Sequence, residues 1–446
     1  MATLTQSDSP VATAEHLQLS AGVRKIFNYI IGAGVLVLAL GLLASILHWG
    51  DEHHAAAGEA ASNLGASAGH GAGASAHHEG SPVWLKRLLV SIWHSNVFFI
   101  GVSVVGTVWM AIQYVAYAGW SVSVKRISEA LSVWLLPGGV IMLIIFFLGR
   151  HDIFHWTHEG IMEKGHANYD KIIAGKSGFL NLPFYLIRMV SYLGIWWFFS
   201  KKFRELSLAE DLNGGTYYFH KSIKTAALFL VLFAVTSSMA AWDWVMSVDT
   251  HWFSTMFGWY VFASWWVTGI ATILLTAIFL KQAGYLRLLS AGHIHDLGKF
   301  MFGFSIFWAY IWFSQFMLIW YANLPEEAVY FNQRLGGFEG RYTWMFFFNL
   351  FINFVFPFLA LMTRDAKRQM IMLKIVCIAI IVGHWSDFYL MLMPGTLKGE
   401  NGFLIEIGVA LIFLGAFLIL MTRRLAAAPL VPLHHPFLDE SVHHAT

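Results

Sequence analysis

The stretch IFNYIIGAGVLVLALGLLASILH (Ile26–His48) contains 23 residues and not one Asp, Glu, Lys or Arg. About 20 apolar residues in a helix span the hydrocarbon core of a bilayer, so this stretch predicts a transmembrane helix. The preceding residues 1–23 are polar and lack the basic start of a signal peptide. No convincing small-residue cleavage site follows the apolar stretch either, and we therefore expect the helix to be retained.

Similar apolar runs recur to the end of the chain. The 446 residues are 57% hydrophobic and 12% charged, whereas a soluble domain is nearer one quarter charged. We predict ten spans, near residues 26–48, 88–118, 128–149, 182–200, 223–246, 252–280, 300–321, 342–362, 370–392 and 402–421. The predicted fold class is therefore an all-α polytopic membrane protein. Pro137 and Pro357 should kink the third and eighth spans, because proline removes a helical hydrogen bond.

The basic residues predict the orientation. Of the 28 Lys and Arg residues, 18 fall on the side of both termini, nine fall in the opposite loops, and Arg188 lies within a span. By the positive-inside rule, the N-terminus and C-terminus should be cytoplasmic, in a bacterial inner membrane. The loops at 49–87, 150–181, 247–251, 322–341 and 393–401 should then face the periplasm.

A weak internal repeat predicts the domain organisation. Spans two to five and six to nine each begin with a long helix and a short basic loop, which indicates two four-helix bundles flanked by one helix at each end. The predicted order is a cytoplasmic tail (1–23), a first transmembrane helix (24–50), a periplasmic low-complexity loop (51–82), a first bundle (83–246), a second bundle (247–394), a last transmembrane helix (395–425) and a cytoplasmic tail (426–446).

Ionisable side chains gather towards the predicted periplasmic side. Such groups are costly at membrane depth and are usually functional. The candidates for binding a quinone or relaying protons are His94, Arg188, Asp243, Asp249, His251, Glu326, His384, Asp387 and Glu406. A crevice that opens outward would suit quinol oxidation, which needs a His or carboxylate base, a polar donor and flat aromatic walls.

Simpler interpretations remain open for several of these residues. Asp243, Asp249 and His251 would equally suit interfacial water, and Arg188 is expected to form an ion pair with a carboxylate such as Asp387 or Glu406.

Metal and haem sites have little support in the sequence. Only His94 and His384 lie well within spans, and hydrogen-bonded histidines are the preferred interpretation over haem ligands. The single Cys377 excludes an internal disulfide and an iron–sulfur cluster, which needs about four thiolates. We therefore predict no haem, no iron–sulfur cluster and no metal site in this chain, and a net charge of +2 gives no indication of nucleic-acid binding.

Three stretches carry a family resemblance: WDWVMSVDTHWFST (Trp242–Thr255), HDLGKFMFG (His295–Gly303) and WYANLPEE (Trp320–Glu327). They resemble the membrane subunits of alternative complex III, the bacterial quinol:cytochrome c oxidoreductase, and more closely the second, smaller polysulfide-reductase-like (NrfD-like) subunit. The likeness covers roughly residues 85–425. It implies two four-helix bundles plus two further helices. It also implies three partners, namely a homologous NrfD-like membrane subunit, a periplasmic iron–sulfur subunit and a multihaem cytochrome c subunit.

Three functions are therefore considered. The first is a quinone-associated subunit of a respiratory quinol:cytochrome c oxidoreductase that supports quinol oxidation at the periplasmic side, with no redox centre of its own. The second is a proton-conducting or scaffolding subunit of the same complex without its own quinone site. The third, a stand-alone secondary transporter, is less favoured because transporters place their polar groups near the middle of the membrane.

Overall fold

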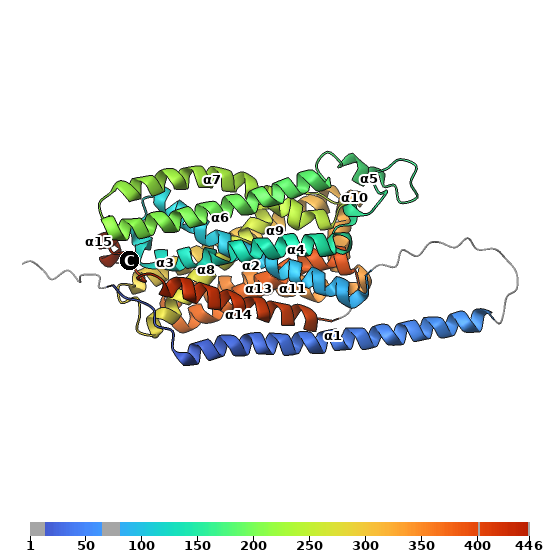
Figure 1. The fold of residues 1–446 in the computed structure, drawn as a ribbon, viewed down its shortest axis with the longest axis horizontal. Helices are drawn as coiled ribbons and strands as arrows, with labels where there is room; N and C mark the ends of the chain where they lie inside the picture. Colours follow the sequence, from blue (N-terminus) through green and yellow to red (C-terminus); the bar gives the residue numbers. More distant parts are fainter. Residues whose placement is uncertain (1–13, 65–80, 400–401, 445–446) are drawn as a thin grey trace, which may run out of the picture.

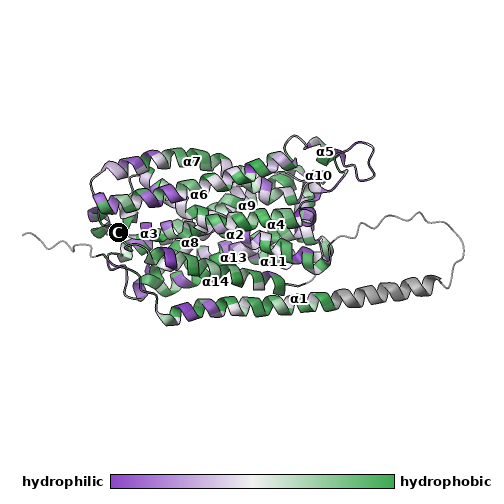
Figure 2. Cartoon of the chain, in the orientation of Figure 1, coloured by the Kyte–Doolittle hydropathy of each residue, from purple (hydrophilic) through white to green (hydrophobic). Residues whose placement is uncertain are grey.

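The computed structural model describes residues 14–64, 81–399 and 402–444, and within these ranges every regular element is helical (Figure 1). Ten segments within these described ranges are long and apolar enough to span a membrane. The predicted all-α polytopic membrane protein is confirmed. Hydrophobic residues predominate along the helices between the two ends of the molecule (Figure 2).

The spans match the predicted positions to within a few residues at most ends. They are α1 (Ala21–Leu64), α2 (Val83–Val115), α3 and α4 (Lys125–Leu131 and Leu135–Ile153), α6 (Leu182–Asn213), α7 (Tyr217–Trp244), α8 (Phe257–Gln282), α9 (Ala291–Ala322), α11 and α12 (Thr343–Leu350 and Phe356–Ala360), α13 (Met370–Leu397) and α14 (Leu404–Ala426). Three short helices lie between or after the spans, namely α5 (Lys171–Gly175), α10 (Pro325–Leu335) and α15 (Leu438–Val442).

Helices that follow one another in the chain pack together, as α6 does with α7 and α8 with α9, and α7 also packs against α8. We use the name first bundle for α2, α4, α6 and α7, and the name second bundle for α8, α9, α11–α12 and α13. Helices α2 and α8 pack against each other between the bundles, and α14 packs against α2. Helix α1 lies at the edge of the molecule, where it packs mainly against α14 (Figure 1).

Both described ends of the chain lie at the same end of the molecule, which we call the terminal end. There the Leu430 N–H donates to the carbonyl of Glu15 over 2.8 Å. The opposite end, which we call the loop end, carries α5 and α10 (Figure 1). This arrangement agrees with an even number of spans.

Several elements differ from the predicted boundaries; α9, for example, begins at Ala291 rather than near residue 300. Helix α1 continues to Leu64, into the loop predicted from residue 51, because alanine, the strongest helix former, is frequent there. Helix α6 runs 13 residues beyond the predicted end at 200. The segment 322–341, predicted as a loop, contains α10, which starts at Pro325 after the left-handed Asn323.

The predicted proline kinks coincide with irregular helix geometry. In the eighth span a π-helical segment (Phe351–Val355) immediately precedes Pro357. In the third span a 3₁₀ turn (Ser132–Trp134) breaks the helix, so Pro137 lies in the first turn of α4. A missing N–H is tolerated in a first turn, because that donor has no partner within the helix.

Glycines allow α1 to approach α14 closely. A Cβ at Gly34 would lie 2.9 Å from the carbonyl oxygen of Gly408, and one at Gly408 would lie 2.5 Å from the Leu38 nitrogen. Side chains at these positions would force the backbones apart, as in other membrane helix pairs with small residues at the interface.

We expect Gly34→Leu to destabilise this helix pair by about 1–3 kcal/mol through overpacking. Gly32→Leu is the matched control, because a Cβ at Gly32 meets nothing within 4 Å. Thermal unfolding of the detergent-solubilised chain should show a lower midpoint for the first variant only. Equal midpoints would show that the two helices do not need this close contact.

Candidate functional site

The nine candidate residues separate into two groups. Asp249, His251 and Glu326 line one crevice at the loop end. The other six lie in the spans and do not line this crevice: His94, Arg188, Asp243, His384, Asp387 and Glu406. All six are buried, with exposed fractions of 4% or less.

The crevice has a volume of about 800 Å³ and collects residues from five parts of the chain. They come from the start of α2, from the end of α4 and the turn after it, from residues 248–252, from α10 and the turn after it, and from the end of α13 with Lys398. Its aromatic wall is the indole of Trp252, which stacks on Tyr330 with ring centroids 4.0 Å apart. Ligand pockets typically have volumes of about 300–1,000 Å³, so the crevice is large enough for a small molecule.

Histidines are concentrated in this crevice. His251 Nε2 lies 2.6 Å from Asp170 Oδ2, and His151, His155 and His158 line the crevice nearby. Burial lowers the pKa of His155, and the neighbouring His158 and His251 lower it further. His155 is therefore neutral at neutral pH and can accept a proton.

The pair of His251 and Asp170 has the geometry of an oriented base. If Nε2 of His251 carries the hydrogen that is donated to Asp170, then Nδ1 is free to accept a proton. The hydrogen bond from His251 also lowers the pKa of Asp170. Asp170 Oδ1 in turn accepts the N–H groups of Ile172 and Ile173, which caps α5 and fixes the carboxylate.

Asp249 is held by Arg334 of α10. The Arg334 Nη2 donates to Asp249 Oδ2 over 3.0 Å, and its Nε donates to the carbonyl of Leu390 over 2.9 Å. That carbonyl lies four residues before Pro394, which has no N–H to offer it. Arg334 therefore satisfies a backbone group that the proline leaves open and fixes Asp249 at the crevice.

Arg188 forms an ion pair with a carboxylate as expected, but the two carboxylates named as examples were wrong. Arg188 does not pair with Asp387 or Glu406 but makes two hydrogen bonds to Asp243, both 2.8 Å long, from Nε to Oδ2 and from Nη2 to Oδ1. Asp243 is fully buried, so interfacial water is excluded for it. The Tyr192 hydroxyl completes the site by donating to Asp243 Oδ2 over 3.2 Å.

Glu406 and His94 also have partners that the sequence did not indicate. Glu406 Oε1 accepts from Arg87 Nε over 2.7 Å, which ties α14 to α2. His94 Nε2 lies 2.9 Å from the carbonyl oxygen of Trp385, which links α2 to α13. Both contacts are buried, and they connect helices of different parts of the fold.

Asp387 has a different environment. Its Oδ1 accepts from the Tyr260 hydroxyl, and its Oδ2 accepts from Ser264 Oγ over 2.9 Å and from Trp308 Nε1 over 3.1 Å. These donors are all neutral. The nearest ionisable nitrogen is His384 Nδ1, 3.7 Å from Oδ2.

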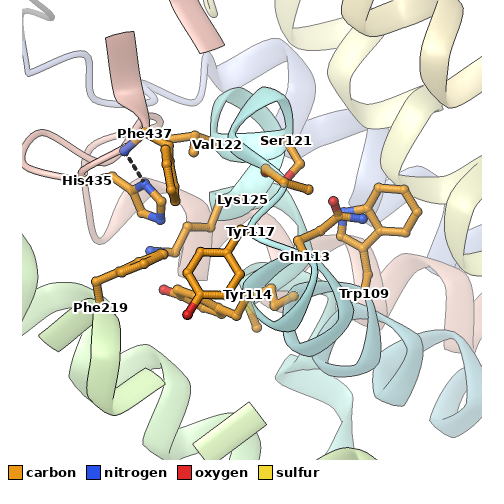
Figure 3. A pocket seen from close by; sticks show the side chains of 12 residues that line it. Trp109, Gln113, Tyr114, Tyr117, Ser121, Val122, Lys125, Phe219, His435 and Phe437 are labelled. Carbon is orange, nitrogen blue, oxygen red and sulfur yellow. Dashed lines mark hydrogen bonds between the residues drawn. The ribbon is translucent and has the colours of Figure 1, made fainter. Parts of the chain in front are cut away.

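The terminal end is closed by the residues that follow α14. Figure 3 shows Tyr114, Lys125 and His435 around a cavity of only about 20 Å³, with Phe437 beside them. Burial, together with Lys125 and Arg126, lowers the pKa of His435 to about 2, so this histidine is neutral. The cavity has room for about one water molecule, which is too little for a larger ligand.

Sequence reasoning missed several residues at the crevice. His151, His155 and His158 line it, whereas Asp170 and Arg334 hold the lining residues His251 and Asp249. A signal was present for Arg334, because Pro325 followed by Glu326 and Glu327 marks a helix start, which places Tyr330 and Arg334 one turn apart. No spacing signal links Asp170 to His251, since 81 positions separate them.

Among the residues that the structure describes, no group of three His, Cys, Asp or Glu side chains is placed to hold a metal ion. No family model matches this chain, and no curated protein matches it.

Arg188→Leu should destabilise the first bundle by about 3–5 kcal/mol, because it leaves the buried carboxylate of Asp243 without a cation. Size-exclusion chromatography after solubilisation should show a smaller monodisperse fraction. The double variant Arg188→Leu/Asp243→Asn should recover most of that fraction, since it removes both charges. A single variant as stable as the wild type would show that the ion pair is unimportant.

The contact between His251 and Asp170 should depend on pH. An aspartate with a lowered pKa stabilises the fold above its unfolded pKa of about 3.9, and this contribution is lost as the pH falls through the lower folded value. We expect the amides of Ile172 and Ile173 to exchange faster below about pH 4. Hydrogen exchange, corrected for its intrinsic pH dependence, measures this.

In His251→Ala the pKa of Asp170 should move back towards its ordinary value, so faster exchange should begin at a higher pH. The same onset in wild type and variant would contradict a role for His251 in holding Asp170.

Proposed function

We propose that this chain is a quinone-associated subunit of a respiratory quinol:cytochrome c oxidoreductase, and that the crevice at the loop end serves the deprotonation of quinol. The observation that carries the proposal is His251, held at 2.6 Å by Asp170 beside the stacked ring of Trp252. The crevice thus combines a base with an aromatic wall, two of the features that quinol oxidation needs.

The chemistry assigns the proton steps to this chain. A quinol hydroxyl would donate to Nδ1 of His251, and Asp170 would stabilise the imidazolium that forms as the proton transfers. His155, with its lowered pKa, offers a second acceptor in the same crevice. Oxidation of one quinol releases two protons and two electrons, so the protons leave through the crevice and the electrons pass to redox centres of partner subunits.

We also propose an orientation in the membrane and a set of partner subunits for the chain. The loop end would face the periplasm and both termini the cytoplasm of a bacterium, as the distribution of basic residues favours. The electron acceptors would be a periplasmic iron–sulfur subunit and a multihaem cytochrome c subunit, beside a homologous NrfD-like membrane subunit. In mild detergent the chain should co-elute with haem c and iron–sulfur protein. Elution of the chain without these partners would contradict such an assembly.

In the purified complex, His251→Gln should lower the rate of quinol oxidation by about 10²-fold or more, the usual contribution of a general base. Glu326→Gln, at the crevice wall, should lower it less. Glu327→Gln is the matched control, because Glu327 neighbours Glu326 but does not line the crevice. If His251→Gln turned over quinol at the wild-type rate, the crevice would not be the site of deprotonation.

A further inference from the structure

Asp387 is the exception among the buried carboxylates of the described chain. Six Asp and Glu side chains are buried: Glu129, Glu210, Asp243, Asp296, Asp387 and Glu406. Five of them form an ion pair with a lysine or arginine. Within the described ranges, Asp387 has its hydrogen bonds from Tyr260, Ser264 and Trp308, and the ionisable group near it is His384 at 3.7 Å.

The surrounding helices supply no further charge to balance Asp387. Arg334, on the neighbouring α10, already pairs with Asp249 and donates to three backbone carbonyls. His384 is fully buried, and neither of its ring nitrogens has a hydrogen-bond partner among the described residues. The remaining ionisable side chains nearby, Tyr260 and Tyr330, are neutral when protonated.

A net charge at this depth would be costly, because the low-dielectric interior solvates ions poorly. When a neutral His384 imidazole and an ionised Asp387 carboxylate share one added proton, the pair is neutral. It is then either imidazole and carboxylic acid or imidazolium and carboxylate. Without that proton the pair carries one uncompensated negative charge. The geometry therefore favours a pair that binds a single added proton.

We propose that His384 and Asp387 form a proton-storage site in the second bundle, loaded from the crevice at the loop end. Asp387 accepts from Tyr260, and Tyr260 lines a small cavity together with Gln315 and Arg334. The cavity has about 10 Å³, close to the minimum for one water molecule. The Nε2 of Gln315 is buried there without a partner among the described residues, so it is free to hold such a water.

Arg334 connects this cavity with the crevice. Its guanidinium reaches Asp249, which lines the crevice, and Tyr330 lines both the crevice and the small cavity. Polar groups thus run from the crevice past Arg334 and Gln315 to Tyr260 and the storage site. This inference stands on the second bundle alone and does not require that the crevice binds quinol.

Infrared difference spectra between acidic and alkaline buffer test the storage site in the full chain. The proton-linked carboxyl bands should be lost in Asp387→Asn and kept in the control Arg188→Leu/Asp243→Asn, which removes an acid that is ion-paired in the wild type. Ser264→Ala retains the acid but removes one hydrogen bond, so it should shift the frequency of these bands. Bands that persist unchanged in Asp387→Asn, or that Ser264→Ala does not shift, would overturn the proposal.

The polar route from the crevice to the storage site has a separate test. Gln315→Leu removes the polar group of the small cavity and should slow the exchange of these bands in deuterated water about tenfold, as expected for one lost hydrogen-bonded link. Ser314→Ala is the matched control, because Ser314 is the neighbour of Gln315 but does not line the cavity. If the bands of Gln315→Leu exchanged at the wild-type rate, the proposal that the storage site is loaded through this cavity would be overturned. Quinol turnover of the same variants, measured in the complex, reports on the crevice independently.

Discussion

The cost of burying charge in an apolar interior shapes most of the contacts that hold this protein together. A buried carboxylate needs a cation or several hydrogen bonds, and several of these partners come from another helix. Arg188 joins α6 to α7 through Asp243, and Arg87 joins α2 to α14 through Glu406. The same requirement explains Arg334, which satisfies both Asp249 and the carbonyl left open by Pro394. Ion pairs thus act as fixed links between helices whose apolar surfaces would pack in many ways.

One buried acid in each bundle has different partners. Asp243 lies in WDW (Trp242–Trp244) at the loop end of α7, and Asp387 lies two residues after Trp385, in the half of α13 nearer the loop end. In the first bundle an arginine binds the acid through two hydrogen bonds and fixes its charge. In the second bundle only neutral donors and a histidine surround it. The first arrangement suits a structural role, and the second suits a group whose protonation changes.

The crevice and the second bundle share the segment between α9 and α13. The stretch WYANLPEE (Trp320–Glu327) ends α9 and begins α10. Helix α10 then places Tyr330 against Trp252 and Arg334 against Asp249. One short helix therefore contributes to the aromatic wall of the crevice and to the polar connection towards Asp387.

The sequence by itself determined the fold class, the ten spans and the presence of costly polar groups within them. Long apolar runs must become helices in a bilayer, because no other backbone arrangement except a closed barrel satisfies its hydrogen bonds there. Several helix ends were not predictable, since hydropathy does not report where α1 and α6 continue beyond the apolar core. Helix α10 was predicted as a loop because its apolar stripe is short.

Only the tertiary structure decided which polar groups meet. The sequence placed Arg188, Asp243, Asp387 and Glu406 at similar depths, but depth does not tell which helices are neighbours. Rotation of each helix about its axis selects Asp243 for Arg188 and leaves Asp387 with neutral donors. The contact of His251 with Asp170 likewise joins segments 81 positions apart, and no local pattern encodes such a contact. Pairing depends on packing in three dimensions, whereas membrane insertion depends on local hydrophobicity along the chain.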